Sequence, residues 1–380
     1  MKVDPGKISC KRSCFSNQPP QLPPPRRLRI CMTSASQQAN RFAFLDLLRA
    51  IAALSVIVQH LLESVYPDFG TWSQQNVNPG IFGVTLFFLV SGYIIPASLD
   101  RGNLASFWIA RVFRLYPLYW FSIALAILFG QWGYLKPLSH GEIIVNLSMI
   151  QEFVRVPHLM GLYWTLSMEL LFYILCSLAF LVPQWWRSQR LPYLAILGLA
   201  TATLYCYFTK ANIPLGRLQM IVAAFVGMYA YRIDQRNSFE IRPMLLTLIP
   251  TLITAAYTRF GDLVPARISG EPNFSFVCVI ISWLSAYLTF YIAIQVRNRI
   301  HPSILTTPGL MCYSLYLMNP FVLMLTPTNL PPIARILLVL MGSGGIAWVC
   351  WRTIEQPFIQ IGKRIKQRFL LATNAPIGPY

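Results

Sequence analysis

The chain has 380 residues, of which 55% are hydrophobic and only 12% are charged, and its mean hydropathy is +0.51. Soluble globular domains carry about 25% charged residues, so this composition excludes a soluble globule and favours an integral membrane protein. The 31 Lys and Arg residues exceed the 13 Asp and Glu residues and give a net charge of +18. They stand in short clusters between apolar runs rather than along one face, which disfavours a nucleic-acid partner.

The N-terminal segment 1–40 differs from the rest of the chain. It is rich in proline and basic residues and shows no hydrophobic periodicity, which is typical of disordered segments. It lacks the apolar core of a signal peptide, and Met32 offers an alternative start. We therefore expect a disordered tail over 1–40, a membrane domain over 41–357 and a basic cytoplasmic tail over 358–380.

Apolar runs of membrane-spanning length recur throughout the predicted membrane domain. A helix needs about 20 mostly apolar residues to cross a bilayer, so we expect an all-α integral membrane protein, a bundle of about ten transmembrane helices. The segment 141–156 has too many polar residues to span, and its helical spacing predicts a helix in the membrane interface. The predicted spans are 44–62, 80–98, 114–130, 165–183, 191–209, 216–233, 243–257, 275–296, 310–327 and 333–352.

The distribution of Lys and Arg indicates the orientation of the spans. Loops that stay in the cytoplasm are enriched in these residues. With the N-terminus inside, the predicted inner segments hold most of them, whereas the outer loop 63–79 holds none. We therefore expect both termini to be cytoplasmic in the cell membrane, with 63–79 and the aromatic-rich segment 131–164 outside.

Small residues inside the apolar runs have a packing interpretation. In GVTLFFLVSGY, the residues Gly83, Ser91 and Gly92 predict close approach of two helices. The chain has eight cysteines and no CxxC motif, so we predict neither a metal site nor a disulfide framework. Five of the cysteines lie inside apolar runs: Cys176, Cys206, Cys278, Cys312 and Cys350.

Ionisable residues within the spans are candidates for function, because a charged side chain at bilayer depth costs at least about 2.5 kcal/mol. The first span carries Asp46, Arg49, His60 and Glu63. At about 100° per residue, Arg49 and His60 share one face of a helix, roughly 16 Å apart along its axis. The alternatives are a histidine that reaches the interface for hydration and an Arg49–Asp46 pair at i,i+3.

Glu169 stands in the fourth predicted span, about one turn below the outer surface and so near the depth of His60. A carboxylate and an imidazole at one depth can form a general-base pair in which the carboxylate fixes the tautomer. The alternative is a buried carboxylate that bonds to Ser or Tyr neighbours and serves packing.

Arg111 and Arg114 stand one turn apart at the inner end of the third span, in FWIARVFRLYPLYW. Guanidinium groups at this spacing are suited to phosphate. The alternative is ordinary anchoring of the helix by cytoplasmic basic residues.

Two further groups have simpler interpretations. In WRTIEQP, Arg352 and Glu355 predict an i,i+3 pair, and Pro357 predicts the end of the last span. His140 and His158 lie in an outer segment and are expected to be solvated.

Six segments, in this order, resemble the integral-membrane acyltransferase family 3, a group of bacterial sugar O-acyltransferases. Together they extend from about residue 41 to 360, and their combination is specific although each alone is weak. The segments are LDLLRAIAALSVIVQH, GVTLFFLVSGYII, FWIARVFRLYPLYW, YWTLSMELLFY, MCYSLYLMNPF and WRTIEQPF.

The resemblance implies a membrane-bound O-acyltransferase that moves an acyl group, usually acetyl from acetyl-CoA, to a hydroxyl of a cell-surface or exported carbohydrate or lipid-linked glycan. By position it implies that His60 is the essential histidine, Arg49 its paired arginine and Glu169 the acidic catalytic position. Arg111 and Arg114 match the arginines that engage the acyl-CoA donor, with no metal ion. Direct transfer and an acyl-histidine intermediate both fit.

Two positions depart from the family pattern. Thr85 stands where many members have Asp, and Asn319 stands where many have His, so a role for that histidine is absent, and these departures bear on the acceptor more than on the chemistry. Two other classes of protein also place ionisable residues in a multi-span bundle. One is a transporter or exporter of a polysaccharide or its precursor, which would more often show repeated halves. The other is an inactive scaffold.

Overall fold

The computed structural model describes residues 26–137, 139–186, 188, 190–209, 213–235, 274–301 and 306–372. This described part contains helices and no strand, and it confirms the all-α prediction. The chain divides into two compact units, Met1–Ala39 and Asn40–Tyr380. The main helices of the second unit are α3 (Pro79–Asp100), α4 (Leu104–Gln131), α6 (Tyr163–Leu181), α9 (Leu215–Asp234), α11 (Phe276–Val296), α13 (Cys312–Leu325), α14 (Pro332–Cys350) and α15 (Gln356–Ala372). Shorter or peripheral helices are α2 (Phe69–Gln75), α5 (His140–Leu147), α7 (Pro183–Trp186), α8 (Arg190–Thr209) and α12 (Thr307–Leu310).

Helix α1 extends from Arg26 to Val65, so it begins inside the segment 1–40 that we expected to be disordered. From Arg26 onward this segment contains no proline or glycine and many residues with favourable helix propensity. Once the apolar span has formed a helix, each further residue of this kind adds a backbone hydrogen bond without a new nucleation cost. The limits of the membrane domain and of the C-terminal tail stay predictions.

Among the described residues, seven helices are long and apolar enough to cross a membrane. They coincide with seven of the predicted spans, so the chain is a multi-pass membrane protein. The predicted span 310–327 is the shorter apolar helix α13, and 216–233 is α9, a 20-residue helix whose side chains are mostly buried. The run 243–257 lies outside the described residues, so the count of ten and the cytoplasmic location of both termini stay predictions.

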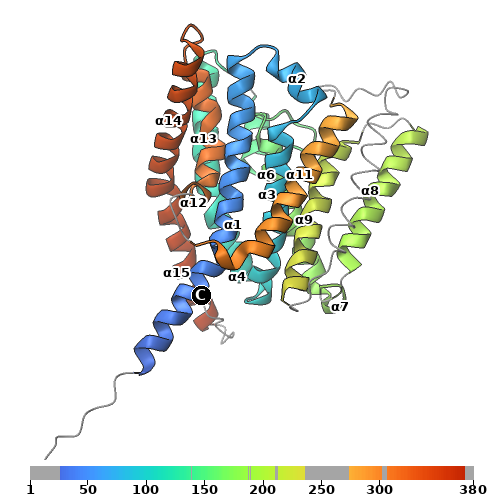
Figure 1. Ribbon diagram of the computed structural model, residues 1–380, viewed down its shortest axis with the longest axis vertical. Helices are drawn as coiled ribbons and strands as arrows, with labels where there is room; N and C mark the ends of the chain where they lie inside the picture. Colours follow the sequence, from blue (N-terminus) through green and yellow to red (C-terminus); the bar gives the residue numbers. More distant parts are fainter. Residues whose placement is uncertain are drawn as a thin grey trace, which may run out of the picture. The chain divides into compact units, whose positions relative to one another are not determined.

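Among the described helices, α3 packs most extensively against α9, and α3 also lies beside α11 (Figure 1). A Cβ atom on Gly92 would lie 1.8 Å from the carbonyl oxygen of Ala224. A Cβ on Gly227 would lie 2.0 Å from the carbonyl oxygen of Leu89. The two backbones are therefore in direct contact, and the close packing predicted at Gly92 is confirmed.

The predicted interface helix 141–156 is shorter than expected, because α5 ends at Leu147 and turns follow it. Its last carbonyl groups, at residues 146–148, accept hydrogen bonds from Tyr119 (2.6 Å), Trp120 (3.1 Å) and Tyr116 (3.2 Å) on α4. These donors satisfy backbone groups that a helix end leaves without partners. The segment around α5 is thereby fixed to the bundle.

The last span does not end at Pro357 as predicted. Helix α14 passes through a π-helical turn, Trp351–Glu355, directly into α15. The Gln356 N–H donates to the carbonyl of Trp351, five residues earlier. Proline lacks the N–H for a normal helical bond, and the wider π turn before it relieves the clash of its ring with the preceding turn.

Candidate active site

A cavity inside the bundle is lined by 17 residues from five helices. The lining residues recur at helical spacing, so each helix turns one face to the cavity. They are Arg49 on α1; Val84, Phe87, Phe88, Ser91, Ile94 and Ile95 on α3; Arg111, Arg114 and Leu115 on α4; Thr165, Leu166, Glu169 and Tyr173 on α6; and Cys312, Tyr313 and Tyr316 on α13.

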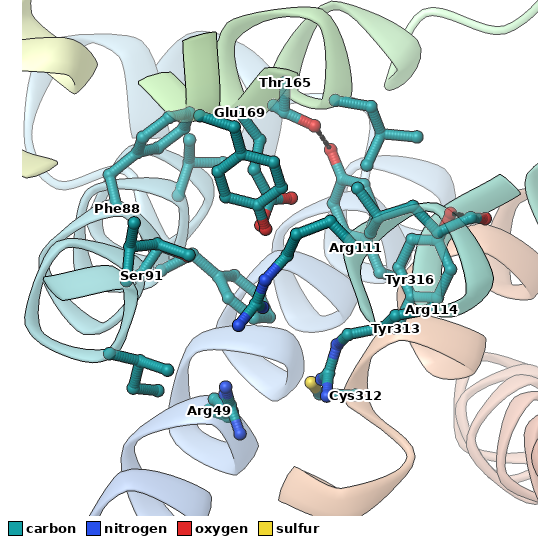
Figure 2. A pocket seen from close by; sticks show the side chains of 17 residues that line it. Arg49, Phe88, Ser91, Arg111, Arg114, Thr165, Glu169, Cys312, Tyr313 and Tyr316 are labelled. Carbon is teal, nitrogen blue, oxygen red and sulfur yellow. Dashed lines mark hydrogen bonds between the residues drawn. The ribbon is translucent and has the colours of Figure 1, made fainter. Parts of the chain in front are cut away.

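Three guanidinium groups converge on this cavity. Figure 2 shows Arg49, Arg111 and Arg114 with their nitrogen atoms directed into the same space. Arg49 pairs with Asp46 at 3.3 Å, which confirms the i,i+3 pair weighed as an alternative, although the side chain also lines the cavity. Arg111 and Arg114 form no ion pair within the described part of the chain. The cavity is therefore suited to an anionic ligand.

Arg111 is held by aromatic rings rather than by a carboxylate. Its guanidinium carbon lies 5.4 Å from the ring centroid of Phe107 and 5.5 Å from that of Tyr173. These cation–π contacts hold the side chain without a direct carboxylate pair. Its Nε atom is buried without a hydrogen-bond partner in the described structure.

Glu169 faces the same cavity from α6, and its carboxylate accepts a hydrogen bond from Tyr173. This contact matches the packing alternative for Glu169, which named Ser or Tyr as the partner. Higher on the same face, the hydroxyl groups of Thr165 and Tyr316 lie 2.7 Å apart (Figure 2). The cavity thus combines cations, one carboxylate and a pair of hydroxyl groups.

His60 is not part of this lining. Its side chain is 51% exposed, and its Nδ1 lies 3.0 Å from Glu63 Oε2. An ionised carboxylate only accepts, so Nδ1–H donates to Glu63 and Nε2 is left to accept a proton. Gln59 donates to the other Glu63 oxygen at 2.6 Å and to Ser73 Oγ at 2.9 Å, which fixes the carboxylate.

The predicted pair of His60 and Glu169 is therefore not formed in the structure. The cavity brings Arg49, Arg111, Arg114 and Glu169 together, and the carboxylate beside His60 is Glu63. Depth counted from the ends of two predicted spans gives no information on how far the helices are shifted along each other, so it does not establish which side chains meet.

His158 is also placed differently from the prediction, because it is only 17% exposed. Its Nε2 lies 2.8 Å from Glu152, a carboxylate that also pairs with Arg217. Its Nδ1 is buried without a partner in the described structure. Burial lowers the pKa of His158, because the charged form loses hydration.

The two positions that depart from the family pattern are both buried. Thr85 donates to the carbonyl of Ile81 at 2.7 Å, and Asn319 accepts from Ser343 at 3.0 Å. The Asn319 bond therefore joins α13 to α14, whereas the Thr85 bond lies within α3. Within the described residues, no group of three His, Cys, Asp or Glu side chains could hold a metal ion.

Several residues at these sites were missed by sequence reasoning or given no role: Glu63, Thr165, Cys312, Tyr313 and Tyr316. Their signal was present in the spacing. Thr165 stands one helical turn before Glu169, and Cys312, Tyr313 and Tyr316 follow the i, i+1, i+4 positions of one helix face. Spacing alone does not show which face of a wholly apolar helix turns inward.

Comparison with known proteins adds the family. A family model described as an acyltransferase domain, that of acyltransferase family 3, matches residues 42–354. The peptidoglycan O-acetyltransferase OatA of Listeria monocytogenes is 23% identical over 88% of this chain and 60% of its own length. The acyltransferase MdmB of Streptomyces mycarofaciens is 27% identical over 44% of this chain and 46% of its own, and nodulation protein 10 of Rhizobium leguminosarum is 32% identical over 41% and 47%.

The chain thus spans between 46% and 60% of the lengths of these three relatives. No solved structure matches it. The family match covers most of the chain and includes the helices that line the cavity. The protein therefore belongs to the integral-membrane acyltransferase family 3.

Proposed function

We propose that the protein is a membrane O-acyltransferase that moves an acetyl group from cytoplasmic acetyl-CoA to a hydroxyl of a cell-surface or exported carbohydrate. The observation that carries this proposal is the convergence of Arg49, Arg111 and Arg114 on one cavity in a member of an acyltransferase family. The cell membrane is the location that this reaction requires, since its donor is made in the cytoplasm and its acceptor lies outside.

The arginine cluster supports a phosphorylated donor. Burying three guanidinium groups within a membrane bundle is costly unless anionic groups compensate them. Arg49 pairs with Asp46, whereas Arg111 and Arg114 form no ion pair within the described part of the chain, so an incoming anion can pair with them directly. The phosphates of acyl-CoA have the charge and the geometry for guanidinium groups, and Glu169 balances part of the positive charge while the cavity is empty.

His60 serves as the general base in this proposal, with Glu63 rather than Glu169 as its carboxylate partner. His60 Nε2 accepts the proton of the acceptor hydroxyl as the hydroxyl oxygen attacks the thioester carbonyl. An ester C–O bond forms, the C–S bond breaks, and the proton passes from Nε2 to the leaving thiolate. The thioester-bearing arm of the donor has to cover the roughly 16 Å of helix axis between Arg49 and His60.

Direct transfer and an acyl-histidine relay use the same nitrogen atom. They differ in kinetics, because only the relay gives ping-pong behaviour and an isolable acyl-enzyme. The acceptor class rests on the likeness to OatA, whose name states a peptidoglycan acceptor. We extend this to carbohydrate hydroxyl groups in general.

The test uses membranes that contain the full chain, radiolabelled acetyl-CoA and surface glycans extracted from the host. We expect the wild type to place label in alkali-labile ester on the glycan and His60→Ala to abolish this transfer at an equal protein level. His140→Ala is the matched control, since His140 is an exposed histidine on α5. Transfer by His60→Ala at the wild-type rate would remove the base from the proposal, and no transfer by the wild type would contradict the enzyme assignment.

A further inference from the structure

Glu355 is an ionisable residue in a membrane span for which the reaction above has no role. The sequence predicted a pair between Glu355 and Arg352 at i,i+3. In the structure Arg352 is exposed, whereas Glu355 is only 2% exposed and turned into the protein. A buried carboxylate is costly unless it is hydrogen-bonded and faces a positive charge. The groups that compensate Glu355 therefore indicate which part of the protein it acts on.

The π-helical turn Trp351–Glu355 explains why Glu355 points inward. A π turn adds one residue to the helix, and each residue advances the helix by about 100°. Without this extra residue Glu355 would face another direction. Such turns frequently occur at functional sites, and this one is followed by Pro357, which a regular helix would accommodate poorly.

The carboxylate of Glu355 is fixed by α13. Ser314 Oγ donates to Glu355 Oε2 at 2.7 Å, and both side chains are buried. Ser314 directly follows the cavity-lining residue Tyr313 on α13 but does not line the cavity itself. Glu355 therefore lies behind the cavity wall, not in the cavity, and Ser314 sets its direction.

Arg114 is the main cation that Glu355 faces. Glu355 interacts electrostatically with Arg114 and, to a smaller extent, with Arg49. The two side chains form no ion pair within the described part of the chain, so the guanidinium group of Arg114 keeps its donors for the cavity. A carboxylate that attracts a guanidinium group without a direct hydrogen bond holds that group in place and leaves its N–H donors unoccupied.

We propose that Glu355 is a positioning residue for the acyl donor, which holds Arg114 in the direction that binds the donor's phosphates. This inference rests on the proposed function, because it assigns Glu355 a part in the binding of acyl-CoA. It predicts an effect on donor affinity and none on the chemistry at His60, which lies outside this cavity.

The test compares Glu355→Gln with Glu355→Asp and with Arg352→Gln, the exposed neighbour on the same π turn. Glutamine keeps the size of the side chain and can still accept the bond from Ser314. We expect Glu355→Gln to raise KM for acetyl-CoA about tenfold with kcat changed by less than about threefold, as for loss of an interaction made equally in the ground and transition states. Glu355→Asp should restore most of the affinity, and Arg352→Gln should match the wild type.

A double-mutant cycle with Arg114→Gln separates positioning from a general structural effect. If Glu355 acts through Arg114, adding Glu355→Gln to Arg114→Gln leaves KM unchanged, whereas independent effects multiply. If Glu355→Gln does not accumulate in membranes, Ser314→Ala, which frees the carboxylate but keeps its charge, should raise KM about threefold.

Failure of the Glu355 inference and failure of the proposed donor give different results. The inference alone is overturned if the wild type uses acetyl-CoA and KM is unchanged in Glu355→Gln or Ser314→Ala. Multiplicative effects in the double-mutant cycle would overturn it in the same way. A wild type that neither binds nor uses acetyl-CoA overturns the proposed donor and the inference with it.

Discussion

At the scale of single residues, the two carboxylates Glu63 and Glu169 have separate surroundings and therefore separate expected roles. Glu63 accepts from His60 Nδ1 and from Gln59. Glu169 lies among the arginines of the cavity and accepts from Tyr173. In the proposed reaction Glu63 fixes the histidine tautomer, and Glu169 balances the donor-binding charge.

Substitution of each carboxylate by its amide tests this division. Glu63→Gln should lower kcat by about 10²-fold, because the amide no longer fixes the tautomer that leaves Nε2 free. Glu169→Gln should change mainly KM for acetyl-CoA, since it alters the charge of the cavity. Steady-state kinetics in membranes measure both. The reverse assignment, a kcat defect in Glu169→Gln with a normal Glu63→Gln, would restore the pair predicted from sequence.

Much of the candidate site could be predicted from sequence because its residues are chemically unusual where they stand. Arg49, Arg111, Arg114 and Glu169 are ionisable groups inside apolar runs, and the structure brings all four to one cavity. The carboxylate partner of His60 could not be predicted, because sequence spacing does not show whether its side chain turns to Glu63 on the same helix or to Glu169 on α6. Glu355 was misread for a different reason, since a π turn breaks the i,i+3 rule that placed it beside Arg352.

At the scale of elements, the crossing of α3 and α9 depends on glycine. Gly92→Ala would bring a Cβ atom to 1.8 Å from the carbonyl oxygen of Ala224, whereas Gly198→Ala on α8 meets nothing within 4 Å. We expect Gly92→Ala to lower the free energy of unfolding by about 3 kcal/mol. Gly198→Ala should be neutral or stabilising by up to about 1 kcal/mol, from helix propensity.

Thermal unfolding of the two variants in detergent measures this difference. The pair is matched, since both exchange glycine for alanine inside a helix and differ only in the space that the Cβ atom meets. Equal stability of the two variants would show that α3 and α9 do not touch as described.

The segment that follows α5 should respond to pH through His158. An unfolded histidine protonates near pH 6.5, and burial lowers the pKa of His158 below this value. As the pH falls below 6.5 the unfolded segment therefore takes up the proton before the folded one, so stability that is complete above pH 6.5 is lost progressively. Protonation would also place a buried N–H without an acceptor at Nδ1.

Hydrogen exchange of the backbone over 148–162 measures this response. Exchange should be faster at about pH 5.5 than at about pH 7.5 after correction for the intrinsic rate, and the difference should disappear in His158→Gln, which does not titrate. The same pH dependence in the variant would assign it to another group.

At the scale of the whole molecule, the spans were predictable because the bilayer imposes length and apolarity on each of them. Seven of the predicted spans coincide with helices able to cross a membrane in the described part of the chain. Helix ends were less predictable, since they depend on contacts. Helix α1 extends back to Arg26, and α14 continues through Pro357 into α15.

We propose a donor-binding cavity around Arg49, Arg111 and Arg114 and a separate base at His60, with the donor entering from the cytoplasmic side. Inverted and right-side-out membrane vesicles with labelled acetyl-CoA in the outer solution test this sidedness most directly, since the charged donor does not cross the lipid. We expect label in glycan ester only with inverted vesicles, whose cytoplasmic face meets the donor. Equal labelling in intact right-side-out vesicles, or labelling only there, would contradict it.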